Sequence, residues 1–205
     1  NVALAEFVRP SPFAATVKDG AIGLSGGYPD ETVHAALVAA TIKPANSMHR
    51  APGAPAGCEA GGQYALAAAN NFDQGEARLT DTTLTIEGRA KSPDAFDALQ
   101  TLTRSVPAGI QLAALKIVPP LVSPYIWTAK FDGKAVTIAG NAPVPELADT
   151  LRAAAPAGIP VSTALTLASG EPSGFADNAL ALLKSLLTLE QGQASIQDGV
   201  IVLTG

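Results

Sequence analysis

Apolar residues alternate with other residues along several short stretches of the chain, and this period of two is typical of a half-buried β-strand. In the stretch TVKDGAIGLSGG, residues 16–27, two such runs flank Asp19-Gly20. Asp-Gly favours a tight two-residue turn because glycine readily takes a positive φ, so the stretch predicts a β-hairpin. Four hairpins are predicted, with turns at Asp19-Gly20, Asp81-Thr82, Asp132-Gly133 and Asp198-Gly199. The turn without glycine is expected to be the looser one.

A glycine ends the second strand of each predicted hairpin, and a helix is expected after the first three. The four glycines are Gly26, Gly88, Gly140 and Gly205. In the best-marked helix Ser92 is suited to the N-cap, Pro93 to the first helical position, and Phe96 and Leu99 lie on one face.

The same four-residue stop follows two of these helices. Pro-Ala-Gly-Ile occurs at 107–110 and again at 156–159, and a weaker form occurs at 44–46. In that weaker form Asn46 is expected to replace glycine in a left-handed helix end. A short strand is predicted after each stop, for example over 112–118.

Two further helices are predicted before the second and fourth hairpins, over about 58–72 and from Phe175 onward. Each full unit therefore has the order helix–strand–strand–helix–strand. Small mixed sheets with helices packed on one face follow from these patterns, so the predicted fold class is α+β.

The chain repeats itself. Residues 55–88 align without a gap to residues 172–205, at a constant offset of 117. This repeat predicts a first super-repeat at 11–118, with a second unit starting near 55, and a second super-repeat at 121–205 whose last unit is truncated. Residues 1–10 resemble the tail of a preceding unit, and Pro119-Pro120 and residues 50–57 are expected connectors. We expect both ends to be cut from a longer array.

Composition narrows the functional classes. The net charge is −5 and the sequence pI about 4.9, with no basic cluster, so nucleic acid is not an expected partner. Cys58 is the one cysteine, which leaves no intramolecular disulfide. The longest charge-free run, 153–170, is interrupted by Pro156, Gly158 and Pro160, which argue against a membrane-spanning helix.

Ser25 is a candidate nucleophile, because Gly23-Leu24-Ser25-Gly26-Gly27 fits the G-x-S-x-G elbow of serine hydrolases. The aligned positions in the other hairpins hold glutamate, alanine and threonine, so the repeat does not call for a hydroxyl. A triad would also need a histidine, and the chain offers only His34 and His49. The predicted set of catalytic residues is therefore none, with hydrolysis through Ser25 as a remote alternative.

The remaining candidates are better explained by structure. Single histidines do not supply the three or four ligands of a zinc site, so no metal and no cofactor are predicted. Cys58 aligns with Phe175 on an apolar helix face and is expected in the core. Tyr125 and Trp127 could form a ligand platform, but their period-two spacing favours the core. Acidic residues at 30–31 are explained by the dipole of the following helix.

The strand–strand–glycine–helix pattern resembles BON domains, the small repeated modules of bacterial envelope and osmotic-shock proteins. It is carried by AIGLSGGY (21–28), TLTIEGRAKS (83–92) and AVTIAGNAP (135–143). The tandem, alanine-rich form most resembles the periplasmic part of OmpA-family outer-membrane proteins. The family's glycine matches Gly26, Gly88, Gly140 and Gly205, where the resemblance implies a structural role.

The resemblance implies a non-enzymatic periplasmic module in an outer-membrane-associated protein, acting as a spacer or interaction domain in envelope maintenance. Its implied partners are phospholipid, or peptidoglycan through a domain outside these residues. A lipid- or small apolar ligand-binding module is the alternative, because low charge and alanine-lined helix faces leave room for an apolar groove. An unpaired strand edge near Gly205 could also support self-association.

Overall fold

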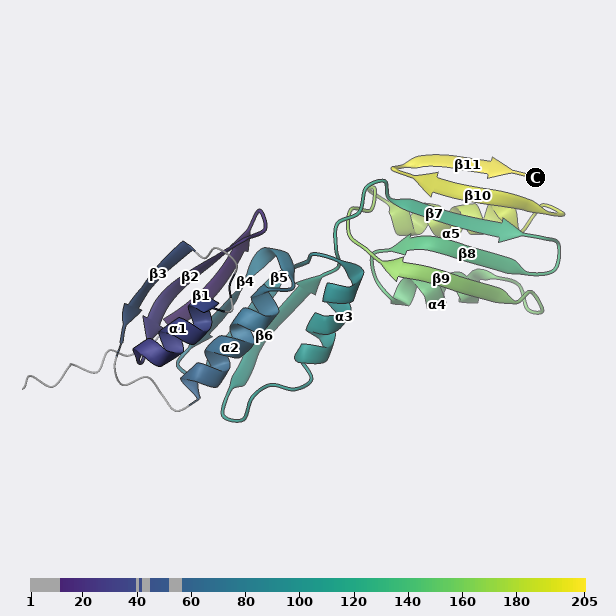
Figure 1. The fold of residues 1–205 in the computed structure, drawn as a ribbon. Helices are drawn as coiled ribbons and strands as arrows, with labels where there is room; N and C mark the ends of the chain where they lie inside the picture. The colour runs from purple at the N-terminus through teal and green to yellow at the C-terminus, as the bar shows by residue number, and fades with distance from the viewer. Residues whose placement is uncertain (1–11, 40, 42–44, 52–56) are drawn as a thin grey trace, which may run out of the picture. The chain divides into compact units, whose positions relative to one another are not determined.

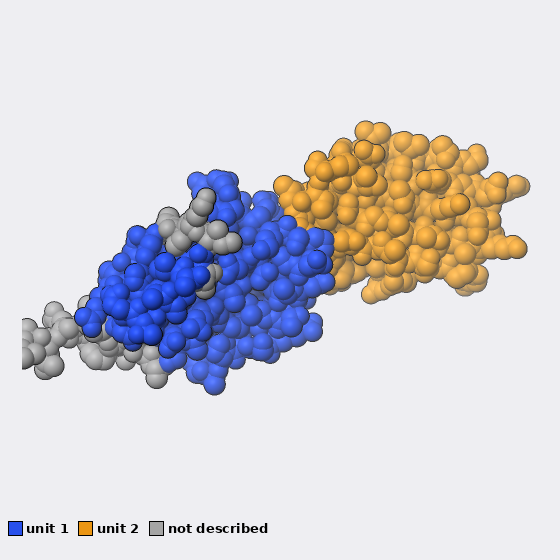
Figure 2. All heavy atoms as spheres, in the orientation of Figure 1, with its two compact units in different colours: residues 1–118 blue, residues 119–205 orange. Residues whose placement is uncertain are grey.

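A computed structural model describes residues 12–39, 41, 45–51 and 57–205 of the chain. The predicted tail at 1–10 and most of the connector at 50–57 lie outside these residues. The chain divides into two compact units, residues 1–118 and residues 119–205 (Figure 2). Each unit has its own sheet and helices and is described by itself.

Unit 1 is a six-stranded sheet with three helices on one face (Figure 1). Its elements are β1 (Pro12–Lys18), β2 (Ala21–Tyr28), α1 (Glu31–Ala39), β3 (Ala45–Arg50), α2 (Cys58–Ala69), β4 (Phe72–Thr80), β5 (Thr83–Ala90), α3 (Pro93–Leu102) and β6 (Gln111–Val118). The strand order is β3-β2-β1-β4-β5-β6. The antiparallel strands β1 and β4 form the centre, and β3 and β6 join β2 and β5 in parallel.

Unit 2 repeats this arrangement with five strands in the order β11-β10-β7-β8-β9. Its elements are β7 (Ile126–Phe131), β8 (Val136–Ala142), α4 (Glu146–Ala154), β9 (Val161–Leu167), α5 (Phe175–Leu186), β10 (Gly192–Gln197) and β11 (Val200–Thr204). β7 and β10 take the central places of β1 and β4, and β9 joins β8 in parallel. The predicted α+β class is confirmed.

The core of each unit lies between its sheet and its helices. In unit 2, Tyr125 and Trp127 are fully buried and lie in one cluster with Phe175 and Leu183 of α5. In unit 1, Cys58 is also buried at the start of α2. The prediction that these aromatic residues and Cys58 belong to the core is confirmed.

The hairpin turns differ from expectation in two places. Only two residues, Asp81 and Thr82, separate β4 from β5, as in the turns at Asp19 and Asp198. Asp81 takes a φ of +54°, close to the values of Asp19 and Asp198. The prediction of a looser turn was therefore wrong. Aspartate tolerates the left-handed region better than most residues, which explains the result. At Asp132 the strands are instead joined by four residues, 132–135, and the Asp132 carboxylate accepts the amides of Lys134 and Ala135. These backbone hydrogen bonds lower the pKa of Asp132.

The predicted helix stops also need correction. The Ile110 amide donates to the carbonyl of Pro107, and Gly109 has a φ of +83°. At 107–110 Pro-Ala-Gly-Ile is therefore a β-turn that leads into the next strand, a few residues after α3 has ended at Leu102. At 156–159 the same turn directly follows Ala155, the C-cap of α4, so the predicted stop holds for that helix. Asn46 lies inside β3 and not in a left-handed helix end, whereas Pro44 falls outside the described residues. Helix α2 ends at Ala69, three residues earlier than expected.

Candidate functional site

Ser25 lies in β2, where it pairs with Ala14 of β1 and Ser47 of β3. Its neighbour Leu24 is buried on the face that the helices cover, so Ser25 lies on the opposite face. His34 is on α1 and therefore on the wrong side of the sheet to activate it. Among the described residues, no hydrogen bond joins Ser25 to either histidine. The G-x-S-x-G match thus sits in a strand that continues for three residues beyond the serine, rather than at a strand-to-helix elbow.

The hairpin glycine that follows Ser25 is required by a close approach of two strands. Gly26 has a φ of +100°, and a Cβ there would collide with the Pro12 carbonyl oxygen. Gly140 repeats this geometry in unit 2, with a φ of +112° and Trp127 Cα 2.9 Å from the position of a Cβ. A Cβ at Gly88 or Gly205 would likewise meet backbone of the partner strand.

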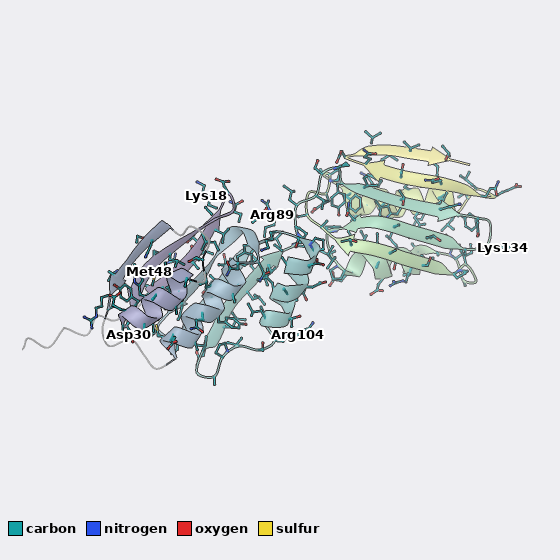
Figure 3. All side chains as sticks on the ribbon, viewed as in Figure 1. Lys18, Asp30, Met48, Arg89, Arg104 and Lys134 are labelled. Atoms are coloured by element: carbon teal, nitrogen blue, oxygen red, sulfur yellow. The ribbon has the colours of Figure 1, made fainter. Side chains whose placement is uncertain are left out.

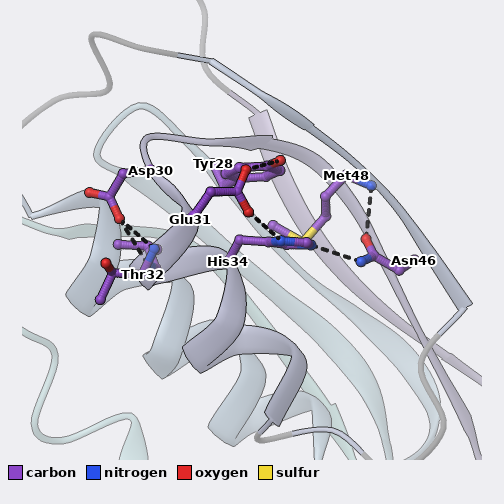
Figure 4. A network of polar contacts seen from close by, with 8 residues as sticks. Tyr28, Asp30, Glu31, Thr32, His34, Asn46 and Met48 are labelled. Atoms are coloured by element: carbon purple, nitrogen blue, oxygen red, sulfur yellow. Dashed lines mark hydrogen bonds and ion pairs between the residues drawn. The ribbon is translucent and has the colours of Figure 1, made fainter.

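Polar side chains gather where β2, α1 and β3 meet (Figure 4). We call Tyr28, Glu31, His34 and Asn46 the His34 cluster. The rings of Tyr28 and His34 are stacked, with centroids 4.3 Å apart and planes 11° from parallel. Glu31 accepts the Tyr28 hydroxyl through Oε1 at 3.0 Å and contacts His34 Nδ1 through Oε2 at 3.3 Å. The hydrogen bond to Glu31, followed by partial desolvation and the carboxylate charge, raises the pKa of Tyr28.

The hydrogen bonds of the cluster define where the imidazole proton lies. Asn46 Oδ1 accepts the Met48 amide at 3.0 Å, so the amide nitrogen of Asn46 faces His34. That nitrogen lies 2.9 Å from His34 Nε2, which must then act as the acceptor. This geometry assigns a proton to Nδ1, toward Glu31. The lone pair that a general base would use is therefore already occupied.

The same kind of bridge occurs in unit 2 with different chemistry. Arg152 of α4 donates to Asp149 Oδ1 at 2.7 Å and to the hydroxyl of Thr163 on β9. Thr163 is the equivalent of Asn46, because each pairs with the residue two places before the hairpin glycine. In both units a helix side chain, held by an acid three residues earlier, thus reaches the same strand position. Because both bridges end at the same strand position, we interpret the His34 cluster as fastening α1 to β3.

Sequence reasoning missed this cluster. Tyr28, Glu31 and His34 recur at intervals of three, which is a signal for side chains meeting on one face of a helix start. Asn46 carried no local signal, because it reaches His34 only through the pairing of β3 with β2. No group of three or more His, Cys, Asp or Glu residues suited to a metal occurs within the described ranges.

The other candidate nucleophile is buried. Burial, and to a lesser extent the charge of Asp81, raises the pKa of the Cys58 thiol, which disfavours the reactive thiolate. Tyr125 and Trp127 do not form a platform at the surface. Tyr125 Oη and Trp127 Nε1 are both buried with no hydrogen-bond partner among the described residues, and burial raises the pKa of Tyr125.

A surface hollow is found beside a pair of hairpin glycines in each unit. In unit 1 a cavity of about 310 Å³ lies over Gly75 and Gly88, and in unit 2 one of about 460 Å³ lies over Gly192 and Gly205. Their linings share little chemistry. The first includes Glu87, Arg89 and Lys116, whereas the second includes Lys130, Asp132, Gln191, Gln193 and Thr204. The common feature is the pair of glycines, and the different charges of the two linings do not indicate a shared ligand.

Basic side chains are spread over the elements (Figure 3). Lys18 ends β1, Arg89 lies in β5, Arg104 follows α3, and Lys134 lies between β7 and β8. Arg89 is paired with Asp73 at 3.0 Å, which neutralises its charge locally.

Comparisons with known proteins do not assign a family. No protein-family model matches the sequence, and no curated protein matches it. Over the part of the chain that the structure describes, no helix has the length and apolar character needed to cross a membrane.

Replacing His34 with alanine is expected to loosen α1 from β3 and to lower the stability of unit 1 by about 1 kcal/mol, the usual net worth of such hydrogen bonds. Urea unfolding and amide exchange in α1 and β3 measure this effect. His49→Ala is the matched control, because His49 is exposed and alternates to the other face of β3. Equal loss of stability in both variants would contradict a fastening role for His34.

Proposed function

We propose that this chain is a non-enzymatic module of the bacterial cell envelope, made of BON-like repeats. In this proposal it acts in the periplasm as a spacer or interaction domain of an OmpA-family, outer-membrane-associated protein. The sequence resemblance in the three strand–glycine–helix stretches supports it. The structure adds the repeated unit that those stretches belong to.

The observation that carries the proposal is this unit of a hairpin, a helix and a parallel third strand. It occurs as β1-β2-α1-β3, as β4-β5-α3-β6 and as β7-β8-α4-β9. The candidate catalytic residues belong to this unit. Ser25 lies in strand β2, and His34 links α1 to β3 through Asn46. Repetition of a whole unit favours a function spread along the chain over a single reaction centre.

Fractionation of the cells that encode the chain tests the proposal. The protein is expected in the periplasmic or envelope fraction, and recovery with cytosolic marker enzymes would refute it. Vesicles of phosphatidylethanolamine and phosphatidylglycerol then separate the two roles. Failure of the purified chain to sediment with these vesicles supports a spacer, whereas sedimentation favours the lipid-binding alternative.

A further inference from the structure

Strand β11 exposes more apolar surface than any other strand in the described part of the chain. Across the described residues, eight large hydrophobic side chains are exposed, and four of these eight are consecutive in β11. Val200 is 65% exposed, Ile201 and Val202 are each 47% exposed, and Leu203 is 39% exposed. β11 also lies at the edge of its sheet, so its outer backbone groups have no partner strand among the described residues.

The internal repeat shows what these residues look like when covered. At the offset of 117, Ile201 corresponds to Leu84 of β5, and Leu203 corresponds to Ile86. Leu84 and Ile86 are both fully buried. Ile201 and Leu203 share the helix-covered face of their sheet with Ile196, which is itself buried. The positions of Ile201 and Leu203 are therefore buried core positions in unit 1 but are exposed to solvent in unit 2.

In unit 1, α3 and β6 cover the equivalent positions on β5. α3 packs on β5 and β6, with Phe96 and Leu99 buried, and β6 pairs with β5 in parallel from Thr83 to Arg89. α3 also contacts the neighbouring helix, because the Tyr64 hydroxyl of α2 donates to the Leu102 carbonyl at 2.5 Å.

One flank of helix α5 is likewise exposed where the equivalent flank of α2 is buried. Gly61, Tyr64 and Ala68 are buried at helical spacing along one flank of α2, and the Tyr64 hydroxyl reaches α3 from this flank. Their equivalents on α5 are Asn178, Ala181 and Ser185, and all three are exposed. These residues have short side chains, which allow another helix to approach closely.

We infer that β11 and the adjacent flank of α5 form a docking surface for a helix–strand segment of the α3–β6 kind. The strand of this segment pairs with β11 in parallel, and its amphipathic helix lies beside α5 over Ile201 and Leu203. This inference rests on the packing of unit 2 and not on the proposed place of the protein in the envelope.

Other occupants fit the surface less well. Pairing of β11 with β11 of a second copy would satisfy the strand edge but leave the flank of α5 uncovered. The remaining edge strands do not present a similar surface. β3 is polar, β6 has one exposed large hydrophobic residue, Leu115, and the exposed positions of β9 hold serine, alanine and threonine. Val200 and Val202 lie on the opposite face, where β5 has Thr83 and Thr85, and they are outside the proposed surface.

The test appends a second copy of residues 89–118, which contain α3 and β6, directly after Gly205 of the full chain. Leu203→Cys supplies a thiol on the proposed surface, and the buried Cys58 serves as an internal reference resolved by mass spectrometry. The appended segment is expected to slow thiol labelling at position 203 at least tenfold and to protect the β11 amides from exchange. The matched control carries Phe96→Asp and Leu99→Asp in the appended copy only, and should label at the rate of the unextended chain.

Three results would overturn the inference. The first is an unchanged labelling rate in the extended chain while the amides of β10 show that unit 2 is folded. The second is equal protection by the control segment, which would mean that the helix face is irrelevant. The third is slow labelling already in the unextended chain together with a dimeric mass, which would assign the surface to a second copy.

Discussion

Replacing Gly140 with alanine is expected to destabilise unit 2 by about 3–4 kcal/mol, because backbone strain and a steric collision act together there. The φ of +112° lies in a region that residues with a Cβ rarely adopt, and the new Cβ would meet the Ile126 carbonyl and, at 2.9 Å, Trp127 Cα. Both contacts are backbone of the paired strand β7, so no side chain can rotate away to relieve them. Relief would require the two strands to separate at the centre of the unit.

Gly158→Ala is the matched control. Gly158 has a similar φ of +94°, but a Cβ there would meet nothing within 4 Å. It should therefore cost only the backbone strain, about 1–2 kcal/mol. Urea unfolding monitored by the fluorescence of Trp127, the only tryptophan and one within unit 2, measures both variants. Equal losses would mean that φ alone requires glycine at position 140.

Local features of the fold were predictable because their signals are local. The alternation in residues 16–27 predicts the β1–β2 hairpin, and the Ser92 cap is confirmed by its hydrogen bond to the Ala95 amide at 3.1 Å. The sheet order was not predictable in the same way. β1 pairs with β4, and the paired residues Phe13 and Leu79 are far apart in sequence with no signal that marks them as neighbours.

The His34 cluster shows why the candidate site was missed. The sequence shows His34 as a lone helical histidine, and it predicts a helix end at Asn46 because residues 44–46 are a weaker form of the Pro-Ala-Gly stop. Their contact depends on the parallel register of β3 with β2, which places Asn46 opposite Leu24. A register of this kind is determined by tertiary packing, and a shift of one residue would turn Asn46 to the other face of the sheet.

Replacing Trp127 with alanine is expected to unfold unit 2 while unit 1 stays folded. Trp127 is fully buried in a cluster whose members all belong to residues 119–205, so its loss removes contacts from that core alone. The cost is about 3–5 kcal/mol, as for other buried aromatic residues truncated to alanine, and this is a large part of the stability of a small unit. Amide exchange read by mass spectrometry should show faster exchange in β7, β8 and α5, with β1 and β4 unchanged.

Tyr125→Phe is the control that separates lost packing from lost polarity. Tyr125 lies in the same core, and its ring packs edge-to-face on that of Phe175 with the ring centroids 5.0 Å apart. The buried Tyr125 hydroxyl has no hydrogen-bond partner among the described residues. Removing an unpaired buried hydroxyl while keeping the ring should leave stability unchanged or raise it by about 1 kcal/mol. A loss of more than about 1 kcal/mol in this variant would show that the hydroxyl is hydrogen-bonded in solution. Faster exchange in unit 1 of Trp127→Ala would instead show that the two cores unfold together, since nothing in the truncated cluster belongs to unit 1.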